Sequence, residues 1–387
     1  MFKKINVNFF LIAFFIFSSF IANAQKVLNY NEFITVETEL KSQYFDFNRK
    51  IIIGLPPNYN RMTAQDYDVM YVFDAQDRPY FDLVRSLSVF IDTKYESKFI
   101  VVGVLSPQDK EYTRQDDFLK IKYPSGHGGY HKNFSLFIQN ELMPYIAKNY
   151  RITDRKIAVG HSLGGSFSLE ALLDYELFTD YITVSPNMFL TDWSVSEHLV
   201  NFDYNKLKNN HFIFASDANE ELLEKWQNWK PAREKVYNFF ETQKPKQITF
   251  YHKTYPTSDH MTTVPPALID GFKTYFAYRD SVDEILTQKE HKVKISLVSK
   301  NKFMKDIYIT GNQEALKNWN PKGVKLQAEN DSIFSIELKL KLPAQFKFTR
   351  GSWETEAYIK NSSIPGNLRI ETDKRKNYIF EVSSWAD

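Results

Sequence analysis

The chain has 387 residues, a net charge of +2 and no cysteine. The lack of cysteine excludes disulfides, thiolate metal sites, a cysteine nucleophile and lipid attachment at an N-terminal cysteine. Both signs of charge are spread evenly, so the basic stripe that nucleic-acid binding needs is missing and we expect no nucleic-acid partner. A disulfide-free chain of this length needs a large core and is long enough to build one or two domains.

The first residues have the organisation of a secretory signal peptide. Lys3 and Lys4 supply positive charge, Phe9–Ile21 is apolar, and Ala22-Asn23-Ala24 is a small-residue cleavage site. The apolar stretch is short for a membrane span, and no stop-transfer charges follow it. We therefore predict a signal peptide over residues 1–24, no stable membrane span, and an exported protein that is periplasmic or secreted. An uncleaved anchor is the alternative.

From Asn31 to about Asp280, strand-like and helix-like segments alternate. The later strands are short, apolar and β-branched, as strands buried on both faces should be. Apolar residues recur at helical spacing in Asn133–Tyr150, Leu222–Thr242 and Pro266–Tyr278. This alternation predicts an α/β domain over residues 25–285, with a mostly parallel sheet and helices on both faces. The strand candidates are Phe33–Glu39, Lys50–Leu55, Asp68–Phe73, Phe99–Leu105, Lys156–Val159, Tyr181–Val184, His211–Ala215 and Ile248–His252.

A glycine-rich turn, Gly160-His161-Ser162-Leu163-Gly164-Gly165, directly follows the strand candidate Lys156–Val159 and opens a helix-like segment. In such a nucleophile elbow the serine hydroxyl stands above the sheet, and only small residues fit two positions before and after it. Gly160 and Gly164 meet that demand, and the start of the helix favours developing negative charge. The turn predicts Ser162 as the nucleophile of a serine hydrolase; an ordinary loop with a surface serine is the alternative.

A serine nucleophile needs a histidine base, and the base needs an acid that orients it. In an α/β-hydrolase the chain order is serine, acid, histidine. Of the eight histidines, His260 lies where the base belongs, shortly after the last strand candidate of the first domain. His161 in the elbow and His252 on a strand fit packing or solvent roles. His127 and His131 lie in or beside a glycine-rich loop and precede the nucleophile.

The acid should lie in the loop after the seventh strand candidate. Asp217, Glu220 and Glu221 compete there; we favour Glu220, with Asp217 as the alternative acid. The oxyanion hole should use two backbone N–H groups, one from Leu163 and one from the loop after the third strand, where we choose Gln76. This chemistry requires no metal and no organic cofactor, and no ligand cluster in the sequence suggests one.

Several segments of the first domain share their pattern with a known family: Tyr71–Gln76, Phe137–Tyr150, Gly160–Gly165, Ser185–Met188 and Asp259–Met261. Together they resemble the putative esterase family, an α/β-hydrolase group that includes esterase D and the enterobactin esterases, over nearly all of residues 31–279. The resemblance implies an α/β-hydrolase fold, with Ser162 as nucleophile, His260 as base and Glu220 as acid. It also implies Gln76 and Leu163 as oxyanion donors.

The chain departs from that family at two positions. The family usually has Asp-Gly where this chain has Asp74-Ala75, which affects the oxyanion loop. It has Gly where this chain has Asp217, which keeps Asp217 open as the acid.

From about His291 helical periodicity ends and short alternating segments follow, separated by turn signals such as Pro321-Lys322-Gly323. This pattern predicts a small all-β sandwich or barrel over residues 291–387. The strand candidates are Val293–Val298, Asp306–Ile309, Phe334–Leu340, Gln345–Phe348, Glu356–Ile359, Leu368–Glu371 and Tyr378–Val382.

Three stretches of this second region, Ile307–Asn312, Leu316–Pro321 and Phe346–Glu354, resemble the starch-binding family of carbohydrate-binding modules. The resemblance implies that Trp319 and Trp353 are flat platforms for sugar rings, whose C–H faces are apolar. In the alternative, both tryptophans belong to the sandwich core or support the catalytic domain, and the module shapes the esterase cleft.

The sequence thus predicts an exported serine carboxylic ester hydrolase. Its substrate would be a small-molecule or glycan-linked ester, such as an acylated glycan or a siderophore-like ester, with a glycan ligand at the second domain. One alternative is an acyltransferase with the same triad. Another is a glycan-binding protein whose hydrolase domain is inactive.

Overall fold

The computed structural model describes most of the chain: residues 34–57, 59–60, 65–91, 99–220, 227–286, 289–299, 306–360, 367–370, 375 and 377–387. The predicted signal peptide, residues 1–24, and the competing acid Glu221 lie outside these residues. Across the described ranges, no helix combines the length and the apolar character that a membrane crossing demands.

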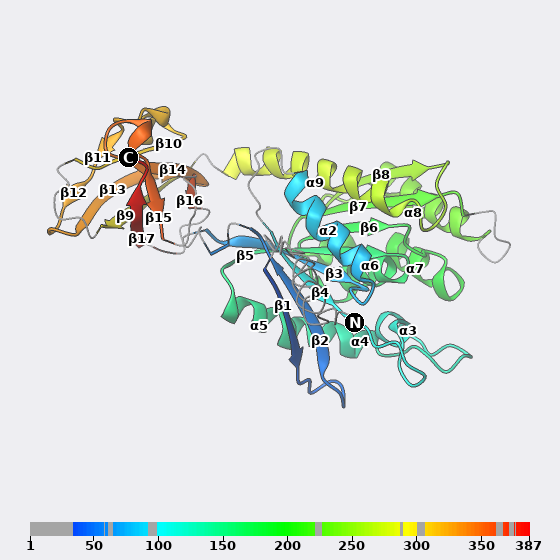
Figure 1. Cartoon of the computed structure of the whole chain (residues 1–387). Coiled ribbons are helices and arrows are strands. Elements are labelled where there is room, and N and C mark those ends of the chain that lie inside the picture. Colours follow the sequence, from blue (N-terminus) through cyan, green and yellow to red (C-terminus); the bar gives the residue numbers. More distant parts are fainter. Residues whose placement is uncertain are drawn as a thin grey trace, which may run out of the picture. The chain divides into compact units, whose positions relative to one another are not determined.

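Within the described residues, eight strands form one sheet in the order β1-β2-β4-β3-β5-β6-β7-β8 (Figure 1). β1 and β2 are antiparallel to their neighbours, and the strands from β4 to β8 in that order run parallel. The prediction of a mostly parallel sheet is confirmed. The strands are β1 (Ile34–Leu40), β2 (Arg49–Leu55), β3 (Tyr67–Phe73), β4 (Phe99–Val104), β5 (Ile152–His161), β6 (Asp180–Val184), β7 (His211–Ala218) and β8 (Ile248–Tyr255).

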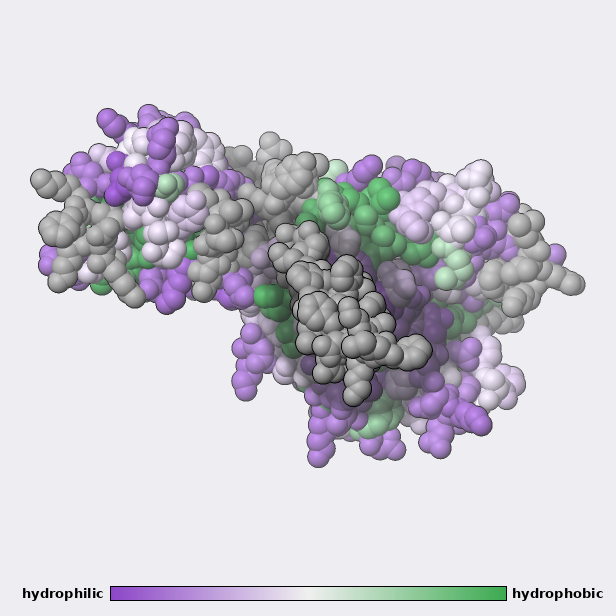
Figure 2. Space-filling view, in the orientation of Figure 1, coloured by the Kyte–Doolittle hydropathy of each residue, from purple (hydrophilic) through white to green (hydrophobic). Residues whose placement is uncertain are grey.

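Helices cover both faces of this sheet, as predicted. α2 and α9 pack on one face, where Phe81 and Leu268 join the inward-facing strand residues. Phe134, Phe167 and Val236 bring α4, α6 and α8 to the core of the opposite face. In the space-filling view, apolar surface gathers over α9 and the adjoining part of α2 (Figure 2). The helices are α2 (Arg78–Phe90), α3 (Arg114–Phe118), α4 (His131–Phe137), α5 (Met143–Asn149), α6 (Leu163–Tyr175), α7 (Leu190–Asn201), α8 (Trp229–Gln243) and α9 (Val264–Leu286).

The central strands of the sheet are buried, and the loops that carry the predicted site residues lie at one of its edges. Every residue of β3 and β4 is buried, as expected for central strands covered on both faces. β1, at the edge, alternates exposed and half-buried residues. Parallel strands end at the same edge of a sheet, which is where ligands bind in α/β folds. The loops after β3, β5, β7 and β8 therefore share one edge, and these loops carry the predicted site residues.

The helix predicted over Asn133–Tyr150 is present but is not a continuous α-helix. α4 passes into a π-helical turn, Ile138–Leu142, and α5 then begins at Met143. Pro144 in the first turn of α5 has no N–H to donate to the preceding turn. A π turn is one way in which a helix absorbs such an interruption.

β9 (Glu290–Val298) opens an all-β region with two sheets (Figure 1). Their orders are β11-β10-β14-β16 and β12-β13-β9-β17-β15. The rings of Phe346 and Phe348 lie 5.5 and 5.8 Å from the ring of Phe380, so β14 and β17 bring the two sheets face to face. The predicted sandwich is confirmed. The remaining strands are β10 (Tyr308–Gly311), β11 (Val324–Lys325), β12 (Gln327–Ala328), β13 (Ile333–Lys341), β14 (Ala344–Thr349), β15 (Ala357–Ile359), β16 (Leu368–Ile370) and β17 (Asn377–Trp385).

A buried ion pair joins the start of β2 to α3. Arg49 donates two hydrogen bonds, of 2.8 and 2.7 Å, to the carboxylate of Asp117, and neither side chain is exposed. The hydroxyls of Ser106 and Tyr112 donate to the same carboxylate at 2.6 and 2.7 Å. A bidentate pair offsets the loss of hydration only when such additional hydrogen bonds are made. The pair therefore fixes α3 beside the strands that it packs against.

We expect Arg49→Met to lower the free energy of unfolding by about 3–5 kcal/mol, because it leaves the buried Asp117 carboxylate without a cation. Arg78→Met is the matched control, since it removes the exposed ion pair with Glu37 and should have a far smaller effect. Urea unfolding of both variants beside the parent measures the difference. Similar losses in the two variants would contradict the importance of the buried pair.

Candidate active site

Ser162 lies at the turn between β5 and α6. Its φ of 57° and ψ of −120° are strained for a residue that carries a Cβ. Its N–H donates to the carbonyl of Val184 at 2.9 Å, and its carbonyl accepts from the N–H of Ser166 at 3.1 Å. The turn is thus hydrogen-bonded to β6 on one side and to the first turn of α6 on the other. The first N–H groups of a helix have no partner within it, so α6 directs donors toward Ser162.

Gly160 and Gly164 allow this turn to be tight. A Cβ on Gly160 would lie 2.4 Å from the carbonyl carbon of Gly164, a distance that real Cβ atoms do not reach. A Cβ on Gly164 would lie 3.1 Å from a carboxylate oxygen of Asp74 and 3.2 Å from Cβ of Phe73. The two glycines therefore let β5 and α6 approach each other and let the elbow approach the end of β3.

The structure brings His260 and Glu220 together, although 40 residues separate them. The two residues lie in the loops after β8 and β7, and His260 Nδ1 is 2.5 Å from Glu220 Oε1. The side chains are 11 % and 1 % exposed. A further bond, from the N–H of Asn219 to the carbonyl of Ser258 at 2.9 Å, ties the two loops to each other. A carboxylate on Nδ1 keeps a proton at that nitrogen, so that Nε2 can act as a base.

Two residues of α8 support this pair, and the sequence analysis did not single them out. The guanidinium of Arg233 forms an ion pair with Glu220 Oε2, and both side chains are buried. The ring of Trp229 packs edge-on against the ring of His260, with centroids 5.3 Å apart. Arg233 lies among the buried residues Ala232 and Val236 of its helix. A charged residue on an apolar helix face indicates a buried partner, and that signal was present in the sequence.

Asp217, the alternative acid, has other partners. Its Oδ1 accepts a hydrogen bond from the hydroxyl of Thr254 at 3.0 Å, and its Oδ2 lies 4.0 Å from Nε of Arg233. Burial raises the pKa of Asp217, while Arg233 and the hydroxyls of Thr254 and Tyr237 oppose that rise.

The loop after β3 contains the predicted oxyanion donor Gln76. Asp74 adopts a φ of 61°, and the N–H of Ala75 donates to the carbonyl of Val104 at 3.3 Å. The side chain of Gln76 donates to Asp74 Oδ1 at 2.9 Å and accepts from the N–H of Ser106 at 3.0 Å. Ala75 replaces the family's glycine without strain, because the left-handed residue is Asp74.

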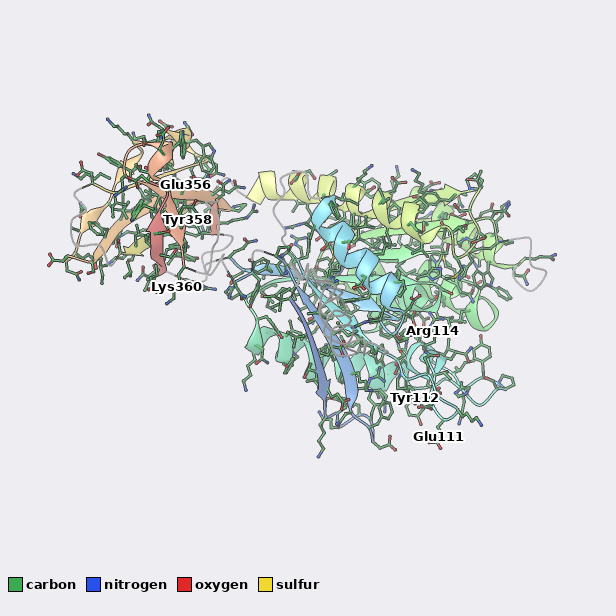
Figure 3. The ribbon with its side chains drawn as sticks, viewed as in Figure 1. Glu111, Tyr112, Arg114, Glu356, Tyr358 and Lys360 are labelled. Carbon is green, nitrogen blue, oxygen red and sulfur yellow. The ribbon has the colours of Figure 1, made fainter. Side chains whose placement is uncertain are left out.

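α3 holds this loop in place through Arg114. Its guanidinium donates to both carboxylate oxygens of Asp74, at 2.6 and 2.5 Å. Asp116, on the same helix, accepts from the N–H of Gly128 at 2.8 Å. Figure 3 shows Tyr112 and Arg114 on the segment that leads into and forms α3. The helix that the Arg49–Asp117 pair anchors is thus also the helix that holds the loop predicted to supply an oxyanion donor.

Several of the other histidines have carboxylate partners of their own, among them His127 and His252. His127 Nδ1 lies 2.8 Å from Asp116 Oδ2, and His252 Nε2 lies 2.6 Å from Glu241 Oε1. His161 differs from them in its partner, because its ring contacts the ring of His260.

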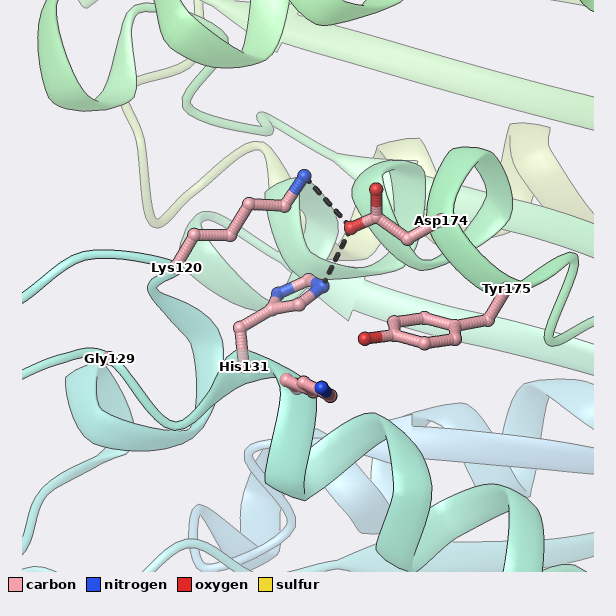
Figure 4. Close-up of a pocket in the computed structure, with 6 residues that line it drawn as sticks. Lys120, Gly129, His131, Asp174 and Tyr175 are labelled. Carbon is pink, nitrogen blue, oxygen red and sulfur yellow. Dashed lines mark ion pairs between the residues drawn. The ribbon is translucent and has the colours of Figure 1, made fainter.

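His131 lines a pocket of about 360 Å³ between α4 and the end of α6 (Figure 4). It is buried, and its Nε2 lies 3.3 Å from Asp174 Oδ2. Lys120 pairs with the same oxygen at 2.8 Å. Burial raises the pKa of Asp174, but the contacts with His131 and Lys120 outweigh burial and lower it to about 2. The negative charge of Asp174 is thus balanced by its neighbours.

The two tryptophans of the all-β region lie on neighbouring loops. Trp353 is 42 % exposed, which excludes it from the sandwich core, and Trp319 is partly buried. The hydroxyl of Thr349 donates to the carbonyl of Pro321, so the loop after Trp319 adjoins the loop before Trp353. Lys347 Nζ lies 5.9 Å from the centre of the Trp353 ring.

A search of the described residues for metal ligands finds no group of three or more His, Asp or Glu side chains arranged to hold an ion.

Comparison with family models identifies two regions of the chain. Residues 42–270 match the model described as putative esterase, and residues 290–373 match the model described as starch binding domain. Both resemblances found in the sequence are thereby confirmed. A search of curated protein sequences finds no match.

Three proteins are among the solved structures that have a similar fold. An IroE-like serine hydrolase from Shewanella oneidensis is 24% identical, with a TM-score of 0.54 over 63% of this chain and 80% of that one. The BES protein from Bacillus cereus is 27% identical, with a TM-score of 0.53 over 64% and 96%. The siderophore hydrolase EstB from Aspergillus nidulans is 19% identical, with a TM-score of 0.51 over 62% and 94%.

The match to the esterase family model, the tight turn at Ser162 and the order of the parallel strands all indicate the same α/β fold. Because the esterase model spans more than half of the 387 residues, the chain belongs to the putative esterase family.

Proposed function

We propose that this esterase is a serine carboxylic ester hydrolase with the catalytic triad Ser162, His260 and Glu220. The contact between His260 Nδ1 and Glu220 Oε1 carries the proposal, because it pairs the base expected after β8 with a buried acid after β7. The strained backbone of Ser162 at the same edge of the sheet supports it. The N–H groups of Leu163 and Gln76 form the oxyanion hole in this proposal.

The reaction has two steps. His260 Nε2 takes the proton of the Ser162 hydroxyl as the oxygen attacks the ester carbonyl, and the two N–H groups stabilise the oxyanion. The protonated imidazole gives that proton to the oxygen of the leaving alcohol as the ester C–O bond breaks. The acyl group remains attached to Ser162. A water molecule, deprotonated by His260, then attacks the acyl carbon, and the proton returns to Ser162 as the carboxylic acid departs. Glu220 stabilises the imidazolium in both steps.

Glu220 is preferred to Asp217 as the acid for two reasons. Glu220 lies within hydrogen-bond distance of His260, whereas Asp217 bonds to Thr254. The second carboxylate oxygen of Glu220 also forms a buried ion pair with Arg233, which holds the acid in place beside the imidazole.

We propose that the chain consists of a signal peptide over residues 1–24, an esterase domain over residues 25–285 and a carbohydrate-binding domain over residues 291–387. The charge and apolar pattern of the first residues supports export to the periplasm or the medium. The extent of the two family models supports the division between the domains.

We further propose that the substrate is an ester linked to or associated with a glycan. The starch-binding model is the observation that favours a glycan over a siderophore-like ester. Trp353 offers an exposed aromatic face, and the charged pair Lys347–Glu356, 2.9 Å apart, lies beside it as a source of hydrogen bonds to sugar hydroxyls. Trp319 on the neighbouring loop can extend this surface.

Ser162→Ala and His260→Ala should each lower the rate of hydrolysis of short-chain p-nitrophenyl esters by at least about 10³-fold, because each removes a group that forms or breaks a bond. The protein used is residues Gln25–Asp387. Thermal unfolding of each variant checks that it is folded. Undiminished hydrolysis by Ser162→Ala would mean that the nucleophile is another residue.

Glu220→Gln should lower kcat by about 10³–10⁴-fold, since the amide cannot stabilise the imidazolium. Asp217→Asn is the matched control, with the same carboxylate-to-amide change in the same loop, and should stay within about tenfold of the parent. Initial rates across a range of ester concentrations separate kcat from KM. A larger loss in Asp217→Asn than in Glu220→Gln would assign the acid to Asp217.

Trp353→Ala should weaken binding to soluble starch at least about tenfold, because it removes the exposed platform. Ile379→Ala, which truncates another exposed apolar side chain of the same region, should bind as the parent does. Affinity electrophoresis in starch-containing gels measures both. Equal retardation of the parent and Trp353→Ala would mean that Trp353 is not part of the glycan site. The rates of ester hydrolysis by both variants, compared with that of the parent, show whether this region affects catalysis instead.

A further inference from the structure

His161, the residue before Ser162, contacts the loop that contains His260. Its Nε2 lies 2.9 Å from the carbonyl oxygen of His260, and the two imidazole rings are 4.5 Å apart between centroids. The residues are 99 positions apart in the chain, so this contact joins the elbow after β5 directly to the loop after β8.

A carbonyl oxygen only accepts hydrogen bonds, so Nε2 of His161 carries a proton and donates it. The groups that face this ring are His260, Asp74, Arg114 and Tyr80. Burial, with the nearby His260 as the next contribution, lowers the pKa of His161 to about 4. His161 is therefore neutral, with its proton on Nε2, at the pH values at which a catalytic histidine works.

The backbone of His161 is held from the opposite side. Nη2 of Arg114 lies 3.5 Å from its carbonyl oxygen, and the same guanidinium grips Asp74 in the oxyanion loop. Residue 161 thus lies between the loop that supplies Gln76 and the loop that supplies His260.

The loop of His260 needs such a contact because it is an exposed turn. Within it, Asp259 Oδ1 accepts from the N–H groups of Met261 and Thr262, at 2.9 and 2.8 Å. Met261 is 62 % exposed. The imidazole of His260 is fixed by Glu220 and Trp229, while the bond from His161 fixes its backbone.

We propose that His161 is a positioning residue: its Nε2–H bond to the His260 carbonyl sets the distance between the base and Ser162. The inference rests on the proposed function, because it assigns His161 a role through His260. A displacement of about 1 Å at a reacting group can lower a rate about 10²-fold. Loss of the bond should therefore lower kcat and leave KM nearly unchanged.

The test compares His161→Leu with His161→Gln in the mature protein. Leucine has a similar volume and no donor, whereas the amide nitrogen of glutamine can reach the position of Nε2. His161→Leu should lower kcat for p-nitrophenyl acetate about 10–100-fold, with KM within about threefold of the parent. His161→Gln should recover most of that loss. His198→Leu is the matched control, because it removes a histidine of α7 that contacts Lys120 and Glu170.

Ser162→Ala in the same series separates the two proposals. If Ser162→Ala is inactive and His161→Leu keeps the kcat of the parent, the triad stands and the role of His161 is wrong. Equal losses in the leucine and glutamine variants would also overturn it, since the donor would then be irrelevant. If Ser162→Ala keeps its activity, the proposed function fails. Thermal unfolding midpoints within a few degrees of the parent show that the kinetic effects are not unfolding.

Discussion

The close approach of β5 and α6 at Gly160 and Gly164 is the constraint on which the site depends. It forces Ser162 into a backbone conformation that costs about 1–3 kcal/mol, and the hydrogen bonds to Val184 and Ser166 hold it there. The same approach brings the elbow against the end of β3. A serine in this position stands at the carboxyl edge of the sheet, where the loops after β3, β7 and β8 also end.

Ion pairs between arginines and carboxylates organise those loops. Arg49 fixes α3 through Asp117, Arg114 on α3 pairs with Asp74 in the proposed oxyanion loop, and Arg233 pairs with Glu220. Each guanidinium faces a carboxylate, so the charges of the site are compensated in pairs rather than left to solvent. This arrangement ties the loop after β3 to α3 and the acid of the proposed triad to α8.

The all-β region relies on different forces. Its sheets are held together by an aromatic core, with Phe346 and Phe348 against Phe380, while Trp353 remains exposed beside Lys347. An aromatic ring left outside a well-packed core is available for a ligand. The esterase model and the starch-binding model cover separate stretches of the chain, residues 42–270 and 290–373.

The sequence by itself determined the alternating fold, the elbow around Ser162 and the all-β region, because glycine spacing, apolar periodicity and turn residues act over a few neighbouring positions. It placed the candidate acids in one loop, but Asp217 and Glu220 have the same local signature. Only the tertiary structure decided which carboxylate lies beside His260, that Arg233 lies behind it, and that His161 contacts the base loop. These contacts join residues from 13 to 99 positions apart, and their geometry depends on how β5, β7, β8 and α8 pack rather than on any local pattern.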